Sequence, residues 1–248
     1  MLTQLTSFAT LGLQPERVTV EIGSAPGESC ITIVGLGDTA VQESKQRVRM
    51  AIRSSGFKLP TGRNVTINLA PADLKKIGPR YDLPIAIGLL LAHELLELPE
   101  GALRSTAIMG ELALDGGLRH VAGVLPAAIA CREHGIATLI VPAVNGVEAS
   151  LVPGVRVLAA ECLNDLLAIL KGEREAPTFD PPAARADAPT AIDFADIRGQ
   201  EQAKRALEIA AAGGHNVLLS GAPGSGKTLL AQALRGILPP LSTEESLE

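Results

Sequence analysis

The octapeptide GAPGSGKT, residues 221–228, has the spacing of a phosphate-binding loop, G-x-x-x-x-G-K-[ST]. Glycines at such positions let successive backbone N–H groups turn inward around phosphate oxygens. We expect Lys227 to reach the β- and γ-phosphates as a positive charge, and the Thr228 hydroxyl to hold Mg²⁺. The expected phosphate-binding residues of the loop are Gly221, Ala222, Pro223, Gly224, Ser225, Gly226, Lys227 and Thr228.

A strand before this loop and a helix after it are the context that supports such a motif. The sequence predicts a short strand at 217–219 and a helix from about Lys227. Only twenty residues follow Thr228. Hydrolysis of a nucleotide also needs an acidic residue at the end of a second strand and an arginine that stabilises the developing charge. These elements do not fit into the twenty residues that follow Thr228. We therefore expect a fragment that does not hydrolyse nucleotide alone, with residues 191–248 less stable than the preceding domain.

A second group of residues with potential chemistry is basic. The stretch 43–80 holds nine of the chain's 22 Lys and Arg residues but only two acidic ones, whereas the remaining chain has 13 basic and 25 acidic residues. Lys45, Arg49 and Arg53 fall at i, i+4 and i+8, on one face of a helix. This pattern fits either an ordinary solvated helix face or a non-specific, salt-sensitive contact with a DNA or RNA backbone.

Other kinds of site have little support in the composition. Cys30, Cys131 and Cys162 are widely spaced and odd in number, so they indicate neither a disulfide framework nor a zinc site. The chain has few aromatic residues on which nucleic-acid bases could stack. Its longest apolar run, 83–92, is too short to span a bilayer, and no signal peptide is evident. We expect a soluble, cytoplasmic protein without a membrane partner.

Three regions follow one another along the chain. Residues 1–170 alternate between strand-like and helix-like segments. Residues 171–190 contain four prolines among charged and small residues, which predicts an extended linker. Residues 191–248 contain the glycine-rich loop. The chain is therefore divided into domains at 1–170 and 191–248.

Within the first region, the hydrophobic pattern predicts a sheet of mixed strand order with helices packed on it, an α/β (or α+β) fold. The expected strands are 17–22, 30–35, 64–70, 106–112, 137–142 and 154–160. The first two are expected to pair with each other across a turn. The expected helices run from Asp38 or Thr39 to about Ser55, and over 82–96, 123–134 and 163–170.

The segments 75–96 and 108–142 resemble the proteolytic domain of Lon proteases, a fold shared with ribosomal protein domains. In that family a serine opens a helix after a Gly-Pro loop, and a lysine near the start of the next helix is its base. The serine position is Asp82 here, or Arg80 if the alignment is made on Gly78 and Pro79, and the lysine position is Leu125. The resemblance thus implies a Lon-like fold without protease activity, because an activated nucleophile is missing. Asp82 is expected to cap its helix.

The segments 24–57, 68–90, 110–126 and 193–228 together resemble the N-terminal part of the ComM/YifB family, which are bacterial Mg-chelatase-like AAA+ ATPases. This resemblance implies a homo-oligomer, a hexamer when full length, which uses ATP and Mg²⁺. It implies ATP-driven DNA branch migration in recombination and natural transformation. It also implies that Ile197, Gly199 and Gln200 lie near the adenine, and that residues 221–228 hold the phosphates.

Two other functions are compatible with the residues. One is a magnesium-chelatase subunit that drives metal insertion into a tetrapyrrole, although the long domain before the glycine-rich loop argues against it. The other is a non-catalytic module for oligomerisation or for docking a partner. Salt-dependent DNA binding by residues 1–170 would favour the DNA-processing function over both.

Overall fold

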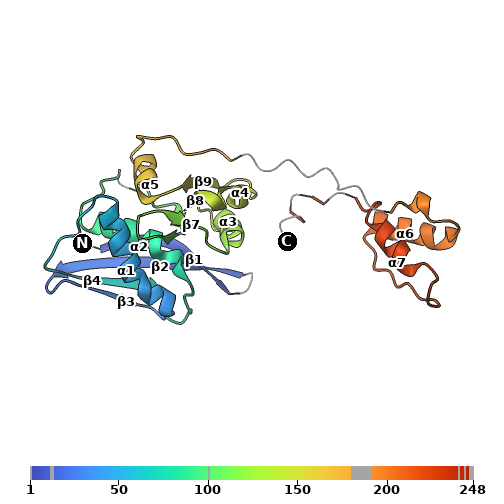
Figure 1. Cartoon of the computed structure of the whole chain (residues 1–248), viewed down its shortest axis with the longest axis horizontal. Helices are drawn as coiled ribbons and strands as arrows, with labels where there is room; N and C mark the ends of the chain where they lie inside the picture. The colour runs from blue at the N-terminus through green and yellow to red at the C-terminus, as the bar shows by residue number, and fades with distance from the viewer. Residues whose placement is uncertain are drawn as a thin grey trace. The chain divides into compact units, whose positions relative to one another are not determined.

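The computed structural model describes residues 2–11, 14–99, 101–179, 192–239, 241–242 and 244–245. The chain divides into two compact units, residues 1–181 and residues 182–248 (Figure 1). Each unit has its own buried apolar cluster. Over the described residues, no helix combines the length and the apolar character needed to cross a membrane.

The first unit is built on a seven-stranded sheet with the order β3-β4-β2-β1-β5-β8-β9. Strand β2 is antiparallel to both of its neighbours, β1 and β4, and all other adjacent pairs are parallel. The predicted α/β fold with mixed strand order is therefore confirmed. The strands are β1 Leu2–Leu11, β2 Gln14–Pro26, β3 Cys30–Val34, β4 Arg63–Ala70, β5 Thr106–Ile108, β8 Thr138–Pro142 and β9 Arg156–Ala160.

Strand β1 is absent from the sequence prediction although it lies inside the sheet. Leu5, Ser7, Phe8 and Ala9 are all buried, so both faces of the strand are covered. A strand that is buried on both faces, and that includes small polar residues, lacks the alternation by which a half-buried strand is recognised. Strand β2 does alternate, with Val18, Val20 and Ile22 fully buried.

The predicted pairing of the second and third strands is wrong. Strand β4 lies between β2 and β3, and β3 runs parallel to β4 with Ile33 opposite Ile67. The alternating pattern of β4 buries Val65, Ile67 and Leu69, which suits an inner strand. Strand β3 buries only Ile33 and forms one edge of the sheet, where the side chain of Gln42 donates to the Ile33 carbonyl at 3.4 Å.

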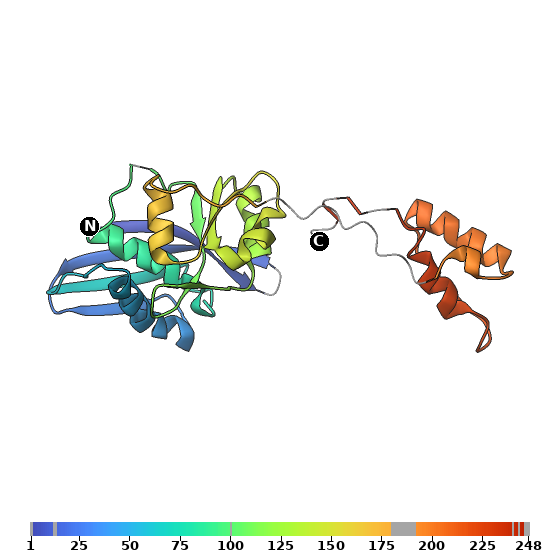
Figure 2. The ribbon, with the colours of Figure 1, turned by 45° about the horizontal axis from the view of Figure 1, so that its top comes forward.

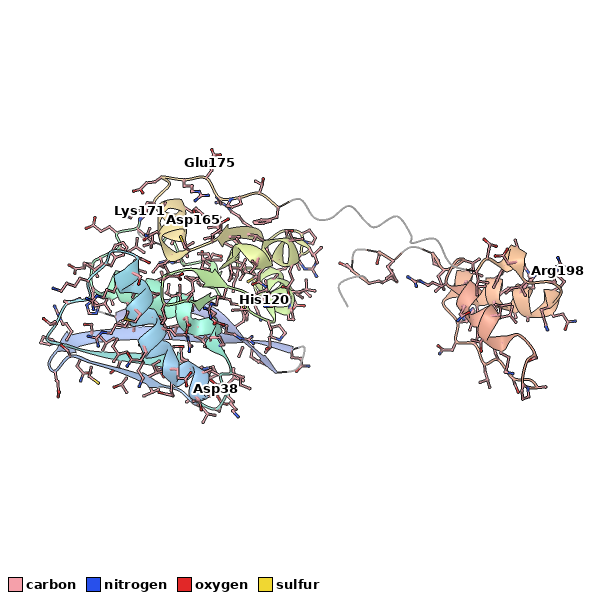
Figure 3. All side chains as sticks on the ribbon, viewed as in Figure 1. Asp38, His120, Asp165, Lys171, Glu175 and Arg198 are labelled. Carbon is pink, nitrogen blue, oxygen red and sulfur yellow. The ribbon has the colours of Figure 1, made fainter. Side chains whose placement is uncertain are left out.

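Helix α1, Thr39–Ser54, begins where the sequence predicts, because the Asp38 side chain caps it. One carboxylate oxygen of Asp38 accepts the Val41 N–H at 2.9 Å and the other accepts the Gly78 N–H at 3.1 Å. Asp38 therefore joins the start of the helix to the loop before α2; Figure 3 shows it at that end of α1.

Helix α2, Asp82–Ala92, is almost entirely buried and lies against β1 and β2, while α1 packs beside it and against β3 (Figures 1 and 2). It follows the short 3-10 helix η1, Pro79–Tyr81. It ends four residues before the predicted Leu96, because Glu94 adopts a positive φ of 56°. Gly88 allows close contact with the sheet, since a Cβ there would lie 2.4 Å from Ile22 Cδ1.

The predicted strand 106–112 is two strands, separated by Met109 and Gly110. Strand β5 joins the main sheet, and β6, Glu111–Leu112, pairs with β7, Leu118–Arg119, in a separate hairpin. The remaining helices are η2 Ala143–Asn145, α3 Val124–Glu133, α4 Gly146–Ser150 and α5 Leu163–Leu170.

The first residues of the predicted linker close helix α5 instead of extending away from it. The N–H groups of Lys171, Gly172 and Glu173 bond back to carbonyls of α5, and Arg174 forms an ion pair with the buried Asp165 (Figure 3 labels Asp165 and Lys171). A buried carboxylate needs a partner, which favours this turn over an extended chain. Residues 180–190 of the predicted linker lie outside the described residues.

The second unit contains η3 Phe194–Asp196, α6 Glu201–Gly213 and α7 Lys227–Leu234. Ile197, Leu207, Leu230 and Ala233 form its buried cluster. The predicted strand at 217–219 is not formed; Leu218 is 92% exposed. A strand needs a hydrogen-bonded neighbour, and none of the described residues of this unit supplies one.

Candidate functional site

The glycine-rich loop of the second unit has the backbone that its sequence predicts. Gly224 and Gly226 have φ values of 77° and 86°, a region in which residues with a Cβ are strained. Gly226 is also the N-cap of α7, and no side chain caps this helix. Because the first amides of a helix have no partner within it, the start of α7 presents N–H donors beside the loop.

The side chain of Lys227 lies over this loop. Its Nζ donates to the carbonyls of Gly221 at 2.9 Å and Ala222 at 2.7 Å, and to the Ser225 hydroxyl at 3.3 Å. The ammonium is thus held at the point where the loop turns. Thr228 follows it in the first turn of α7 and is exposed.

The three residues expected near an adenine lie in the segment before α6. Ile197 is buried in the small core, and Lys204 donates to its carbonyl. Gly199 and Gln200 both have left-handed backbones, with φ of 69° and 61°. The Gln200 side chain donates to the Ser225 carbonyl at 3.4 Å. This bond brings the segment to the glycine-rich loop.

In the first unit, the face of α1 that carries Lys45, Arg49 and Arg53 points away from the core. Arg49 and Arg53 are exposed and Lys45 is half-buried, and none of the three forms an ion pair with any described residue. Among the other basic residues of the 43–80 stretch, Arg47, Lys76 and Arg80 have hydrogen-bond partners within the fold. Lys76, for example, is fully buried and donates to the Pro71 carbonyl.

Asp82 is the centre of a buried polar cluster and is not the helix cap that the sequence predicts. Arg47 donates to it twice, Nε to Oδ2 at 2.8 Å and Nη2 to Oδ1 at 3.1 Å. The Ser44 hydroxyl donates to Oδ1, and the Leu112 N–H donates to Oδ2 at 3.3 Å. A bidentate pair with a guanidinium supplies two charge-assisted bonds and an opposite charge, which a single helix amide does not, so the carboxylate turns toward α1.

This cluster joins α1, α2 and β6. Burial raises the pKa of the Asp82 carboxyl, and the bonds from Arg47 and Ser44 oppose that effect. The hydrogen bond to Asp82 in turn raises the pKa of Arg47. Arg47 belongs to the basic stretch 43–80, and nothing in the sequence spacing of Ser44, Arg47 and Asp82 indicates that their side chains meet.

The two alignments with the Lon domain place the serine position at Asp82 or at Arg80, and the structure distinguishes them. Arg80 Nη1 donates to the Thr10 hydroxyl at 3.1 Å. It also lies against Gly123, two residues before Leu125, since a Cβ on Gly123 would be 3.2 Å from Arg80 Nη1. Asp82 instead points toward α1. Arg80 is therefore the residue that faces the segment carrying the lysine position.

The fold and the loop together define the class of the protein: a mixed α/β domain joined to a glycine-rich loop that opens a helix, as in Mg-chelatase-like AAA+ proteins. Residues 20–145 match the family described as "Subunit ChlI of Mg-chelatase", and residues 193–248 match "Magnesium chelatase, subunit ChlI".

Relatives narrow this class. The uncharacterized protein YifB of Salmonella typhimurium is 46% identical over 242 residues, which cover 97% of this chain and 46% of that protein. Competence protein ComM of Haemophilus influenzae is 42% identical over 246 residues, 98% of this chain and 48% of that protein. The chain belongs to the ComM/YifB family of Mg-chelatase-like proteins, and it spans about half the length of these relatives.

Similarity to Lon proteases is also detectable, but it is weaker. Lon protease 3 of Sorangium cellulosum is 26% identical over 165 residues, covering 62% of this chain and 19% of that protein. Lon protease of Heliobacterium modesticaldum is 28% identical over 145 residues, 56% of this chain and 17% of that protein.

Proposed function

We propose that the second unit binds ATP with Mg²⁺ through residues 221–228. The observation that carries this proposal is the position of Lys227, whose ammonium lies on the loop carbonyls beside the uncapped start of α7. Phosphate oxygens are anionic and accept more strongly than those carbonyls. The loop amides and Lys227 would hold the phosphates, and Thr228 would hold the metal ion.

The residues present fit this cofactor. An added Cβ at Gly224 or Gly226 would have no atom within 4 Å, so the space over the loop is open. Gln200 fixes the preceding segment to Ser225, which would keep Ile197, Gly199 and Gln200 beside a bound base. Bound ATP would supply a phosphoanhydride bond whose hydrolysis can drive conformational work, and Mg²⁺ would offset its charge.

The test is titration of the chain with a fluorescent ATP analogue, with and without Mg²⁺. Lys227→Ala should weaken binding at least tenfold, because a charge-assisted contact is lost. Thr228→Ala should remove most of the Mg²⁺ dependence and leave metal-free binding unchanged. Arg205→Ala, which removes an exposed positive charge of α6 paired only with Glu208, is the control. Equal affinity in Lys227→Ala and the unmodified chain would refute the proposal.

We further propose that the full-length protein is an oligomeric ATPase, a hexamer, which acts on DNA, and that α1 contacts the DNA backbone. Lys45, Arg49 and Arg53 support this proposal because they lie on an outward helix face without acidic partners among the described residues. Such contacts are electrostatic and release counterions, so binding should weaken steeply with salt. The name of the relative competence protein ComM is compatible with a role of this protein in natural transformation.

Fluorescence anisotropy with duplex and branched DNA at two salt concentrations tests this contact. Lys45→Ala/Arg49→Ala/Arg53→Ala should bind at least tenfold more weakly and have a smaller salt dependence. The matched control is Arg104→Ala/Arg132→Ala/Arg156→Ala, which removes three exposed positive charges from other parts of the first unit. An equal loss in both variants would mean that net charge alone, and not α1, determines binding.

A second candidate is a magnesium-chelatase subunit, which is favoured by the family descriptions that match both units. Metal insertion into a tetrapyrrole by the full-length protein, with no response to DNA, would support it. Oligomerisation of the first unit without affinity for DNA or tetrapyrrole would instead indicate an assembly or docking module.

A further inference from the structure

Two arginines of the basic stretch 43–80, Arg47 and Arg80, differ in their surroundings. Arg47 bonds to Asp82, lies 3.7 Å from Glu43 and is also attracted by Glu111. Arg80 has no carboxylate within ion-pair distance among the described residues; its side chain donates only to the Thr10 hydroxyl. Arg80 is nevertheless partly buried, and this burial lowers its pKa. A half-buried cation without a counter-charge is unfavourable in an isolated fold.

The surroundings of Arg80 come from three elements that the chain brings together. Thr10 lies near the end of β1, Arg80 is in η1, and Gly123 immediately precedes α3. Gly123 has a φ of 80°, and a Cβ there would lie 2.7 Å from Thr10 Cγ2 and 3.2 Å from Arg80 Nη1. Only a glycine fits at position 123, so no side chain separates the Arg80 guanidinium from the backbone at the start of α3.

The described acidic side chains near this point do not neutralise Arg80. The first turn of α3 contains no acidic residue, and no side chain caps it at Gly123. Among the described residues, the carboxylate bonded to this helix start is that of Glu148, which accepts the Leu125 N–H at 3.0 Å and is not within ion-pair distance of Arg80. His120, in the loop before α3, is exposed (Figure 3). Thr10, Arg80 and Gly123 are each partly exposed, so a solute can reach them.

We propose that Arg80, with the Thr10 hydroxyl and the backbone at Gly123, binds an oxyanion of the phosphate class. A guanidinium has five donors in a fixed fork that matches phosphate oxygens, and Thr10 uses only one of them. Arg80 also belongs to the stretch 43–80, which has nine basic residues against two acidic ones, and an excess of positive charge attracts anions. Free phosphate and the phosphodiester of a nucleic acid share this chemistry.

This site lies in the first unit and is separate from the glycine-rich loop. The anion site does not depend on the proposed DNA contact by α1. Only the titration with DNA rests on the proposed function of acting on DNA. The site requires a positive charge at residue 80 and a hydroxyl at residue 10, which makes both positions testable.

The experiment follows the backbone amides of Thr10 and Gly123 by NMR while the whole chain is titrated with sodium phosphate, against sodium chloride of equal ionic strength. We expect saturable shifts with phosphate alone. Arg80→Gln should weaken them tenfold or more, because a charged donor is lost. Arg132→Gln, an exposed arginine at the other end of α3, is the control and should leave the affinity unchanged. The amides of the glycine-rich loop report any separate binding there.

If the α1 amides of Arg80→Gln have the same chemical shifts as in the unmodified chain, this variant is folded. If it does not fold, Thr10→Val, which keeps the side-chain volume, tests the site instead. A short DNA duplex in phosphate-free buffer identifies the source. Shifts at Gly123 that Arg80→Gln abolishes indicate a nucleic-acid ligand, and a silent duplex indicates free phosphate; both support the site. If the phosphate-induced shifts persist in Lys45→Ala/Arg49→Ala/Arg53→Ala, the anion site at Arg80 is independent of the proposed DNA contact by α1. No shift beyond chloride, equal shifts with acetate, or unchanged affinity in Arg80→Gln would overturn it.

Discussion

The two units differ in how completely they bury their apolar residues. In the first unit, ten of the eleven residues of α2 are buried. In the second, the buried cluster consists of four residues, and Leu218 is 92% exposed. The glycine-rich loop and α7 nevertheless adopt the conformation that their sequence predicts. The local geometry of the glycine-rich loop therefore depends on glycine torsions and a helix start, whereas the arrangement of the first unit depends on contacts between distant segments.

The largest expected effect tests those distant contacts. Asp82→Ala removes the acceptor of Arg47 and Ser44 and leaves a partly buried guanidinium without its partner, so it should lower the free energy of unfolding of the first unit by about 3–5 kcal/mol. Chemical denaturation followed by circular dichroism measures this change. Glu43→Ala breaks only an exposed ion pair of Arg47 and should cost less than about 1 kcal/mol. Similar costs for the two variants would contradict the structural role of the cluster.

The two units should also differ in how strongly their backbone amides are protected from hydrogen exchange. Amides of α7 should be at least about 100-fold less protected from hydrogen exchange than amides of α2, because a small, exposed cluster opens at a lower free energy than a large core. Hydrogen exchange with mass spectrometry of the whole chain measures both in one sample. Equal protection in the two helices would show that the second unit is stabilised by interactions beyond its four-residue cluster.

The smallest expected effect concerns pH. Burial raises the pKa of the Cys131 thiol to about 12, whereas a thiol in the unfolded chain has its ordinary pKa of 9.0. Unfolding therefore releases a proton above pH 9. The stabilising contribution of the neutral thiol is complete below pH 9 and is lost as pH rises toward 12, by up to about 1.4 kcal/mol for each pH unit.

Denaturation curves between pH 8 and about pH 11 would detect this linkage. Cys131→Ala should have a shallower pH dependence than the unmodified chain, while Cys30→Ala, at an exposed position, should match it. Identical slopes for the Cys131 and Cys30 variants would show that the thiol at 131 is not responsible. The second unit contains no cysteine, so its exchange rates should not depend on either variant.

Features determined by neighbouring residues could be predicted from the sequence. The Asp38 cap of α1, the bounds of α5 and the start of α7 are examples. Features that depend on the choice of a distant partner could not. β4 inserts between β2 and β3, and Asp82 bonds across 35 residues to Arg47 instead of capping its own helix.

The candidate sites divide in the same way. The loop residues 221–228 form one contiguous motif and could be identified directly. The group of Thr10, Arg80 and Gly123 is drawn from three separate segments, and no spacing in the sequence indicates it. The Lon resemblance pointed to residue 80 or 82, and only the geometry distinguishes them.

The edge strand β3 has a consequence for how the protein behaves at high concentration. An exposed, apolar sheet edge can recruit strands from other molecules and start aggregation. Strand β3 is only five residues long, includes the polar Thr32, and has its Ile33 carbonyl occupied by Gln42. These features hinder the addition of further strands at this edge. Removing the Gln42 amide would expose that carbonyl, so this side chain contributes to keeping copies of the chain apart in concentrated solution.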